Sequence, residues 1–252
     1  MKLTILGSGT CVPYVHRGSS GYVLETGGSK LLFDCGSGST WKLAHAGISY
    51  MKIDHIFFSH LHPDHTGDIT AFLFATKYSY WSPYGEQRDK PLCLWGGQGF
   101  GEFFGNLKRA YKDWIVPEGL KVTEIKPGTF DTGDLRVTTV NTPHIDSSLA
   151  YRIECEGKSI VYSGDTDYSE ELIELSYNVD LLIIECALPD EHKRKGHLTP
   201  KEVVKITNAC GAKRIVVTHL YPVSDEEKVV EQIRKNIKAE VIEAHDLLEI
   251  EV

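Results

Sequence analysis

The 252-residue sequence predicts an α/β fold in which two mixed sheets are flanked by helices. Runs typical of strands alternate with helical patterns along both halves of the chain, and no linker-like or repeated segment divides them. This interleaving favours two covered sheets over one doubly wound sheet. A chain of this length buries roughly three-quarters of its unfolded surface, so it can be stable without disulfides. We expect a single domain over residues 1–252.

The expected strands are short runs rich in β-branched, aromatic and other apolar residues, bounded by turn-forming or charged residues. In chain order they are Met1–Leu6, Ser20–Thr26, Lys30–Phe33, Ile53–Ser59, Val137–Val140, Leu149–Cys155, Ser159–Ser163, Asp180–Glu185, Arg214–Thr218 and Leu247–Val252.

Segments with helical patterns lie between these runs. They are Gly67–Tyr78, Phe100–Trp114, Ser169–Ser176, Pro200–Ala209 and Asp225–Lys238. Thr199 is the expected N-cap of the fourth helix, because Pro200 suits a first helical turn and a threonine hydroxyl can accept from a free amide. Three consecutive acidic residues from Asp225 place negative charge at the start of the fifth.

The composition excludes several classes of protein. With 41% hydrophobic and 25% charged residues, the chain is neither disordered nor collagen-like. A net charge of −8 argues against a surface for non-specific nucleic-acid binding. Six cysteines without a C-x-x-C pair argue against a disulfide framework or a thiolate zinc site. We expect a cytoplasmic protein, because neither a secretory signal nor a membrane-spanning apolar run is present.

A dense group of ligand-type side chains follows the expected strand Ile53–Ser59. His60, His62, Asp64 and His65 occur within six residues, at a turn where side chains can reach one point from both sides. Imidazole and carboxylate ligands together suit zinc, iron or manganese. A polar loop that merely contains histidines is the alternative, and the H-x-H-x-D-H spacing after a buried strand disfavours it.

Three further ligand-type residues occupy the same position relative to a strand. His144, Asp165 and His219 each follow an apolar run that we expect to be a strand. A capping aspartate or a histidine at a loop mouth would explain each one alone. The three together predict a single rim at which they meet the group after Ser59.

This ordered set resembles the metallo-β-lactamase superfamily of dinuclear metal hydrolases, over nearly the whole chain from Leu6-Gly7-Ser8-Gly9-Thr10 to His219. The resemblance implies a four-layer αβ/βα sandwich with two divalent ions at one rim, zinc first and manganese or iron as alternatives. It assigns His60, His62 and His144 to one ion, Asp64, His65 and His219 to the second, and Asp165 to both. Asp34 matches a position that braces the site without ligating.

Two residues indicate one branch of this superfamily. Glu185 ends an expected strand and is followed by Gly196-His197-Leu198-Thr199, a pattern that resembles the ribonuclease Z branch. The resemblance implies that His197 protonates the leaving oxygen and that Glu185 orients His197. In the mechanism that we expect, Asp64 accepts the proton of the attacking water while it ligates the metal. A second acid makes chemical sense, because metals activate water but do not protonate an alkoxide. The alternative is a buried ion-pair glutamate and a surface histidine.

The opening loop and the segment before His197 match that branch only in part. Pro13 and Arg17 agree with its Pro-x-Lys-x-Arg-Asn pattern, whereas Val15 and Gly18 replace the lysine and the asparagine. Lys193 stands where the branch has alanine ahead of Gly-His. These departures weaken the match to its substrate contacts.

A larger departure concerns tRNA. Ribonuclease Z enzymes usually carry a tRNA-binding arm between the third metal histidine and the bridging aspartate. Here that interval runs from Ile145 to Gly164 and leaves no room for one. The acidic net charge also removes the phosphate-tracking surface that tRNA binding needs.

The expected function is therefore that of a dinuclear metal-dependent hydrolase, a ribonuclease Z-like phosphodiesterase or nuclease that uses a metal-bridging hydroxide. Two divalent ions, two carboxylates and this hydroxide leave about one net positive charge, which suits a small anionic ester, a phosphodiester, a nucleotide or RNA. The same metals would serve a lactonase, an arylsulfatase or a thioesterase. A non-catalytic metal-binding sensor is a further alternative.

Aromatic residues are frequent over Phe72–Trp114. We expect most in the core or at a homodimer face, and those near Tyr78–Tyr84, including Tyr80 and Trp81, at a pocket wall where they can stack on a base. The basic run His192–Lys195, which precedes His197, is either a solvated loop or a means of attracting phosphate.

Overall fold

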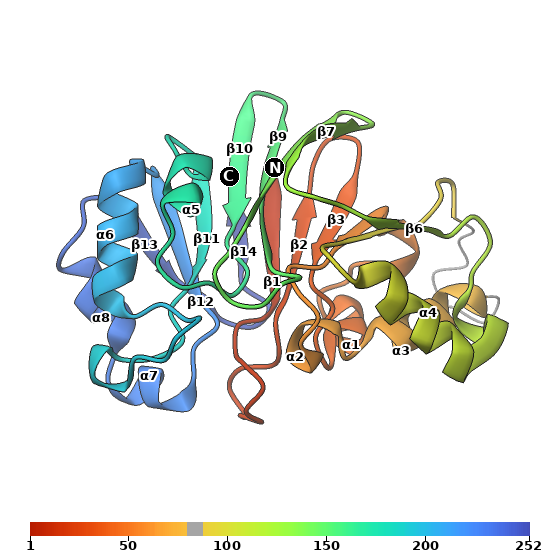
Figure 1. The fold of residues 1–252 in the computed structure, drawn as a ribbon, viewed down its shortest axis with the longest axis horizontal. Coiled ribbons are helices and arrows are strands. Elements are labelled where there is room, and N and C mark those ends of the chain that lie inside the picture. Colours follow the sequence, from red (N-terminus) through yellow and green to blue (C-terminus); the bar gives the residue numbers. More distant parts are fainter. Residues whose placement is uncertain (80–87) are drawn as a thin grey trace.

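The computed structural model describes residues 1–79 and 88–252, whose strands form two seven-stranded sheets (Figure 1). The first sheet has the order β14 (Glu249–Glu251), β1 (Lys2–Gly7), β2 (Gly21–Glu25), β3 (Lys30–Phe33), β4 (His55–Phe57), β5 (Cys93–Gly96) and β6 (Lys121–Glu124). The second has the order β13 (Glu240–Glu243), β12 (Arg214–Thr218), β11 (Leu181–Glu185), β10 (Lys158–Tyr162), β9 (Leu149–Cys155), β8 (Leu135–Asn141) and β7 (Gly128–Thr132). Tyr80, Trp81 and Tyr84 lie outside the described residues.

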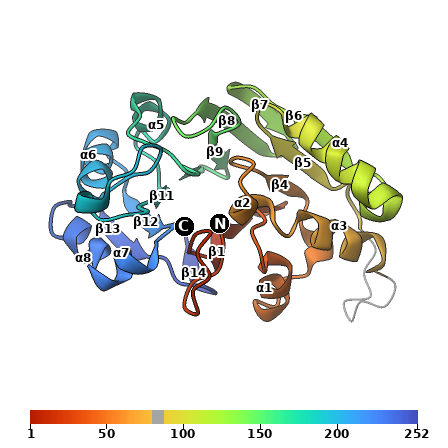
Figure 2. The same cartoon turned by 60° about the horizontal axis from the view of Figure 1, so that its bottom comes forward.

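Helices cover the outer face of each sheet (Figures 1 and 2). Those of the first half are α1 (Ser39–His45), η1 (Tyr50–Lys52), α2 (Pro63–Thr66), α3 (Ile69–Lys77), α4 (Phe100–Tyr111) and η3 (Lys112–Ile115). Those of the second half are α5 (Glu170–Leu175), η4 (Asp190–His192), α6 (Pro200–Cys210), α7 (Pro222–Glu226) and α8 (Val229–Arg234). Among the described residues, none of the helices has the length and apolar character that crossing a bilayer requires.

Three apolar layers hold these elements together. Leu3, Tyr22 and Tyr151 belong to a core between the two sheets. A second core, which includes Val203 of α6, lies between the second sheet and its helices. A third, which includes Phe72 of α3, lies between the first sheet and its helices. The order of layers is helix, sheet, sheet, helix, which confirms the predicted four-layer αβ/βα sandwich.

The strand directions bring several loops to one rim. β3, β4, β5 and β6 run parallel, and so do β10, β11, β12 and β13. β8 and β10 both pair antiparallel with β9, so they end on the same side of the second sheet. The loops that carry the expected ligands therefore leave from carboxyl ends of strands, where α/β sheets bind their ligands.

The structure corrects parts of the element prediction. The sequence does not predict β5, β6, β7, β13 or α1. Of these, β6 and β7 are edge strands whose mostly exposed side chains lack an apolar alternation. The single helix predicted over Asp225–Lys238 is wrong, because α7 ends at Glu226 and Lys228 adopts a φ of 53° before α8 begins. The predicted cap is confirmed, since Thr199 and Glu202 form a capping box.

Arg17 ties the opening loop to the C-terminal part of the chain. Its side chain is 3% exposed and donates two hydrogen bonds to the Asp225 carboxylate, at 2.7 and 2.8 Å. A third bond reaches Glu243 at 2.6 Å. Because these acceptors lie within the protein, Arg17 fixes the loop and does not serve as a free substrate contact.

Candidate metal centre

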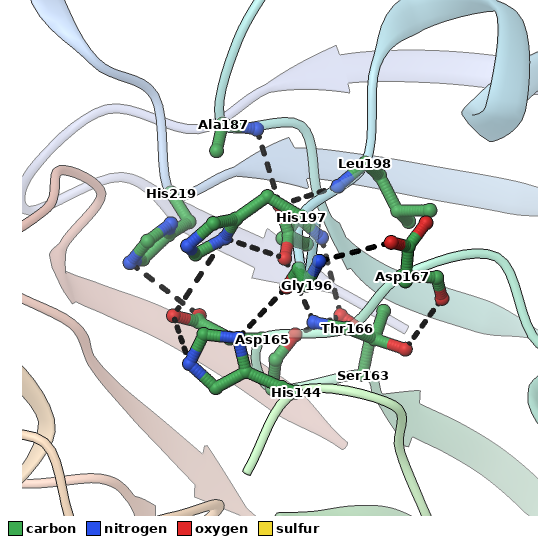
Figure 3. Close-up of polar contacts among 12 residues, drawn as sticks. His144, Ser163, Asp165, Thr166, Asp167, Ala187, Gly196, His197, Leu198 and His219 are labelled. Carbon is green, nitrogen blue, oxygen red and sulfur yellow. Dashed lines mark hydrogen bonds and ion pairs between the residues drawn. The ribbon is translucent and has the colours of Figure 1, made fainter. Parts of the chain in front are cut away.

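The seven proposed metal ligands meet at the rim formed by the ends of β4, β8, β10 and β12. Figure 3 shows His144, Asp165 and His219 pointing toward one another from separate loops. The remaining four come from the turn after β4 and from α2: His60, His62, Asp64 and His65. His219 adopts a φ of 55°, a left-handed conformation that is uncommon for residues other than glycine and that concentrates at functional sites.

Three imidazoles form the first ligand group. His62 Nδ1 lies 3.0 Å from His60 Nε2 and 3.1 Å from His144 Nε2. Together with one oxygen of Asp165, their ligand atoms all lie within 4.8 Å of one another. Burial holds the pKa of His60 well below its ordinary value, so this ring is neutral and can bind a cation.

Asp64, His65 and His219 form the second group. The Nε2 atoms of the two histidines are 3.3 Å apart, and Asp64 Oδ2 lies 3.5 Å from that of His219. Asp165 stands between the two groups, with Oδ1 3.4 Å from both His65 Nε2 and His219 Nε2. Its Oδ2 lies 3.7 Å from His60 Nε2. This is the position expected for a shared ligand.

The donor set fits divalent cations. Among the described residues, buried Asp165 Oδ1 and His219 Nδ1 have no hydrogen-bond partner. An orphaned carboxylate oxygen in a buried place is costly, and a bound cation would satisfy it. Neutral imidazoles and carboxylates are also the ligands that zinc, manganese and iron prefer. The centre is therefore suited to binding divalent metal.

Asp34 supports the second group from behind. Its fully buried carboxylate accepts hydrogen bonds from His65 Nδ1 at 2.7 Å, Ser59 N–H at 2.7 Å and the Tyr162 hydroxyl at 2.5 Å. Burial lowers the pKa of His65, but the charges of Asp165 and Asp34 outweigh it and raise this pKa well above its ordinary value. The contact leaves His65 Nε2 facing the other ligands, as suits a bracing residue.

The Asp34→Asn variant is expected to lose roughly 2 to 3 kcal/mol in the free energy of unfolding. Asparagine keeps the size and tolerates the left-handed backbone, but it turns an N–H group toward buried donors. Urea denaturation of the chelated protein measures the loss. Asp131→Asn, at an exposed position of β7, is the matched control and should change the value by less than about 0.5 kcal/mol. Equal stability of the two variants would show that Asp34 is not a buried anchor.

His197 lies beside the centre (Figure 3), and Glu185 contacts it, as the sequence predicts. Glu185 is 1% exposed, and its Oε1 accepts from His197 Nδ1 at 3.0 Å and from Thr166 N–H at 2.8 Å. Its Oε2 accepts from Leu198 N–H at 3.1 Å. Burial lowers the pKa of His197, but the Glu185 carboxylate raises it to about 9. His197 Nδ1 is 3.9 Å from Asp165 Oδ2.

The sequence does not single out Asp167, and it names Gly196 only as part of the pattern around His197, without a contact to a metal ligand. The Gly196 carbonyl accepts a hydrogen bond from His144 Nδ1 at 2.8 Å. Asp167 Oδ2 accepts from Gly196 N–H at 2.9 Å. The position of Asp167, two residues after Asp165, is the one signal that could have found it. Every residue has a backbone carbonyl, so nothing in the sequence marks the carbonyl of Gly196 as a contact of His144.

A pocket of about 640 Å³ adjoins the centre, and its lining includes Gln98, His144 and Lys195. Lys195 comes from the basic run His192–Lys195, for which the sequence leaves two interpretations, a solvated loop and a means of attracting phosphate. Lys193 of the same run turns inward to the Asp167 carboxylate at 2.6 Å, so for this residue the phosphate interpretation is wrong.

Residues 29–220 match the family described as the beta-lactamase superfamily domain. The chain belongs to the beta-lactamase superfamily. Within the superfamily it is 31% identical to the probable metallo-hydrolase YhfI of Bacillus subtilis, over 87% of each chain. It is 27% identical to the ribonuclease Z of Methanothermobacter thermautotrophicus, over 100% of this chain and 97% of that one. The crystal structure of YhfI matches with a TM-score of 0.85 and 28% identity, over 99% of this chain and 98% of that one. The predicted resemblance is confirmed.

This superfamily member has a compact connection between His144 and Asp165. The interval contains β9, a turn at Glu156 and Gly157 with φ values of 52° and 73°, and β10. Such values fit a tight hairpin turn. As the sequence predicts, this fully described interval holds no inserted arm.

Proposed function

We propose that this protein is a dinuclear metal-dependent hydrolase that cleaves phosphodiesters smaller than tRNA. The observation that carries the proposal is the pair of His197 and Glu185 beside the Asp165 carboxylate. A metal centre alone suits many ester hydrolases, whereas a held proton donor suits a substrate whose alkoxide must be protonated as it leaves. Relatives named ribonuclease Z, which align over the whole chain, support a phosphodiester substrate.

Two divalent ions would occupy the centre, zinc for preference and manganese or iron as alternatives. Their ligands would be His60, His62 and His144 for one ion, Asp64, His65 and His219 for the other, and Asp165 for both. When bound, such ions polarise the phosphoryl oxygens and make water nucleophilic at neutral pH.

Side chains of the protein move the two protons. Asp64 accepts a proton from the attacking water as the bond between that water and phosphorus forms. His197 donates a proton to the leaving oxygen as its bond to phosphorus breaks. Glu185 holds the imidazole of His197 in place for this transfer. A general acid of this kind contributes typically about 10²- to 10⁴-fold in rate.

The substrate that we propose is a small phosphodiester such as a nucleotide or a short RNA. The ribonuclease Z alignment extends over 306 positions, more than the 252 residues here, so that relative has segments without a counterpart. A net charge of −8 offers no broad phosphate-tracking surface. The pocket beside His144, with Lys195 at its wall, has the volume of a small-molecule site.

A substrate panel tests this proposal. The protein is chelated, reloaded with zinc or manganese, and assayed on bis(p-nitrophenyl) phosphate, a dinucleoside phosphate, an aryl sulfate, a lactone and a thioester. We expect phosphodiester hydrolysis that chelation abolishes and metal restores. Faster turnover of the sulfate, the lactone or the thioester would indicate another hydrolase of this fold. A metal-replete protein that is inactive on all of them would favour the sensor.

We further propose that the protein is a cytoplasmic homodimer. Phe74, Tyr78, Tyr111 and Trp114 are exposed at α3, α4 and η3, and the rings of Phe74 and Tyr78 stand 4.9 Å apart. Such aromatic side chains offer an apolar face to a second copy.

A further inference from the structure

One loop carries the proposed proton donor and also contacts a proposed metal ligand. Residues 193–199, between η4 and α6, carry His197, whose Nδ1 contacts Glu185. The preceding residue, Gly196, accepts a hydrogen bond from His144 Nδ1 at 2.8 Å (Figure 3). A histidine that donates through Nδ1 presents Nε2 to its metal, and the acceptor fixes the orientation of the ring. The loop therefore sets a metal ligand as well as the proton donor.

The ammonium group of Lys193 closes this loop. Its Nζ donates to the carbonyl oxygen of His197 at 2.5 Å and to Asp167 Oδ1 at 2.6 Å. It also donates to Glu202 Oε2 at 2.6 Å, the oxygen that accepts from Thr199 N–H at the start of α6. An ammonium has three N–H donors, so acceptors from three segments satisfy it.

Asp167 carries this restraint to the backbone beside the metal ligand. Its Oδ1 is bound by Lys193, and its Oδ2 accepts from Gly196 N–H at 2.9 Å. Asp167 in turn lies two residues after Asp165, on the loop that leaves β10. A continuous set of contacts thus joins Lys193 to the Gly196 carbonyl and, through it, to His144.

The other cations of this run are placed differently. Arg194 and Lys195 are exposed, whereas the Lys193 side chain is only 33% exposed. A charge turned inward against two carboxylates restrains the loop, while its exposed neighbours are free to face solvent.

We propose that Lys193 is a positioning residue whose ammonium clamps residues 193–199 against Asp167 and Glu202, so that one side chain keeps both His144 and His197 in place. The assignment of His197 as the proton donor rests on the proposed function. The effect on His144 does not, because it concerns metal binding alone. Loss of the clamp therefore has two separate consequences, a weaker metal centre and a misplaced acid.

The Lys193→Met variant tests the clamp. Zinc affinity of the chelated protein is measured by competition with a chromophoric chelator, and we expect it to fall roughly 10-fold, the lower end of what loss of a ligand's hydrogen-bond support costs. At saturating zinc, kcat should fall by about 10-fold or more on a dinucleoside phosphate. On bis(p-nitrophenyl) phosphate the loss should be smaller, because nitrophenolate leaves without a proton. Lys193→Arg, which keeps the charge, should recover part of both losses.

Lys201→Met is the matched control. It removes one cation at an 82% exposed side chain in the first turn of α6, directly after the loop, and should leave zinc affinity and both rates unchanged. Parent-like zinc affinity in Lys193→Met, or equal losses on the two substrates, would overturn the clamp. If the parent protein cleaves neither diester, the proposed function fails, and the zinc titration alone then decides on the clamp. Should Lys193→Met not fold, Asp167→Asn removes the same ion pair and must show the weaker zinc binding for the clamp to stand.

Discussion

The Asp165→Ala variant is expected to lose both its bound metal and its hydrolytic activity. The two oxygens of Asp165 face different ligand groups, since Oδ1 lies 3.4 Å from His219 Nε2 and Oδ2 lies 3.7 Å from His60 Nε2. Without this carboxylate neither group has its full donor set. Metal catalysis supplies several kcal/mol of transition-state stabilisation, so kcat/KM should fall about 10³-fold or more. His60→Ala should behave in the same way.

Elemental analysis and kinetics on one preparation measure both losses. Asp131→Ala removes the same charge from an exposed strand position and should keep metal and activity. An Asp165→Ala protein that retains the parent's metal content would show that Asp165 is not a ligand. Full activity in the Asp165→Ala variant would contradict the dinuclear mechanism.

The His197→Ala variant is expected to keep its metal and to lose rate. His197 lies outside the proposed set of seven ligands and is held by Glu185, so its removal leaves those ligands in place. General acid catalysis is worth about 10²- to 10⁴-fold, and we expect a loss in that range on a dinucleoside phosphate. Glu185→Gln should lose rate in the same direction, because it weakens the hydrogen bond that orients the imidazole.

The leaving group separates this role from a structural one. His197→Ala should lose less on bis(p-nitrophenyl) phosphate than on the dinucleoside phosphate. His245→Ala, at a 61% exposed side chain, is the control and should match the parent on both substrates. Equal losses of His197→Ala on the two diesters would contradict the proton-donor role, and a lower metal content would make His197 a ligand.

Much of the site could be predicted because ligands at strand ends leave a local pattern. A buried strand followed by H-x-H-x-D-H is recognisable within ten residues, and His144, Asp165 and His219 repeat the same placement. The central strands could be found for a related reason. β9 and β12 are buried, and the predicted bounds Leu149–Cys155 and Arg214–Thr218 are those of the structure.

The parts of the fold and of the site that the sequence does not predict depend on contacts between residues far apart in the sequence. β6 and β7 are held by pairing at sheet edges, so their sequences carry little apolar signal. Arg17 and Lys193 look like surface cations, yet Arg17 pairs with Asp225 and Lys193 with Asp167. The fold as a whole sets such pairings. The residue type alone does not show whether a basic side chain faces solvent or forms an ion pair with an acidic residue far away in the sequence.

The position of β14 against β1 has a consequence for how the protein comes into being on the ribosome. Leu3 pairs with Ile250, so β1 lacks this neighbour until the chain has been translated as far as β14 (Figure 1). Until then one border of the first sheet stays open and can join to other chains. Nascent chains arrested before residue 249 are therefore expected to need chaperones, and this need should fall once β14 has been made and has paired with β1.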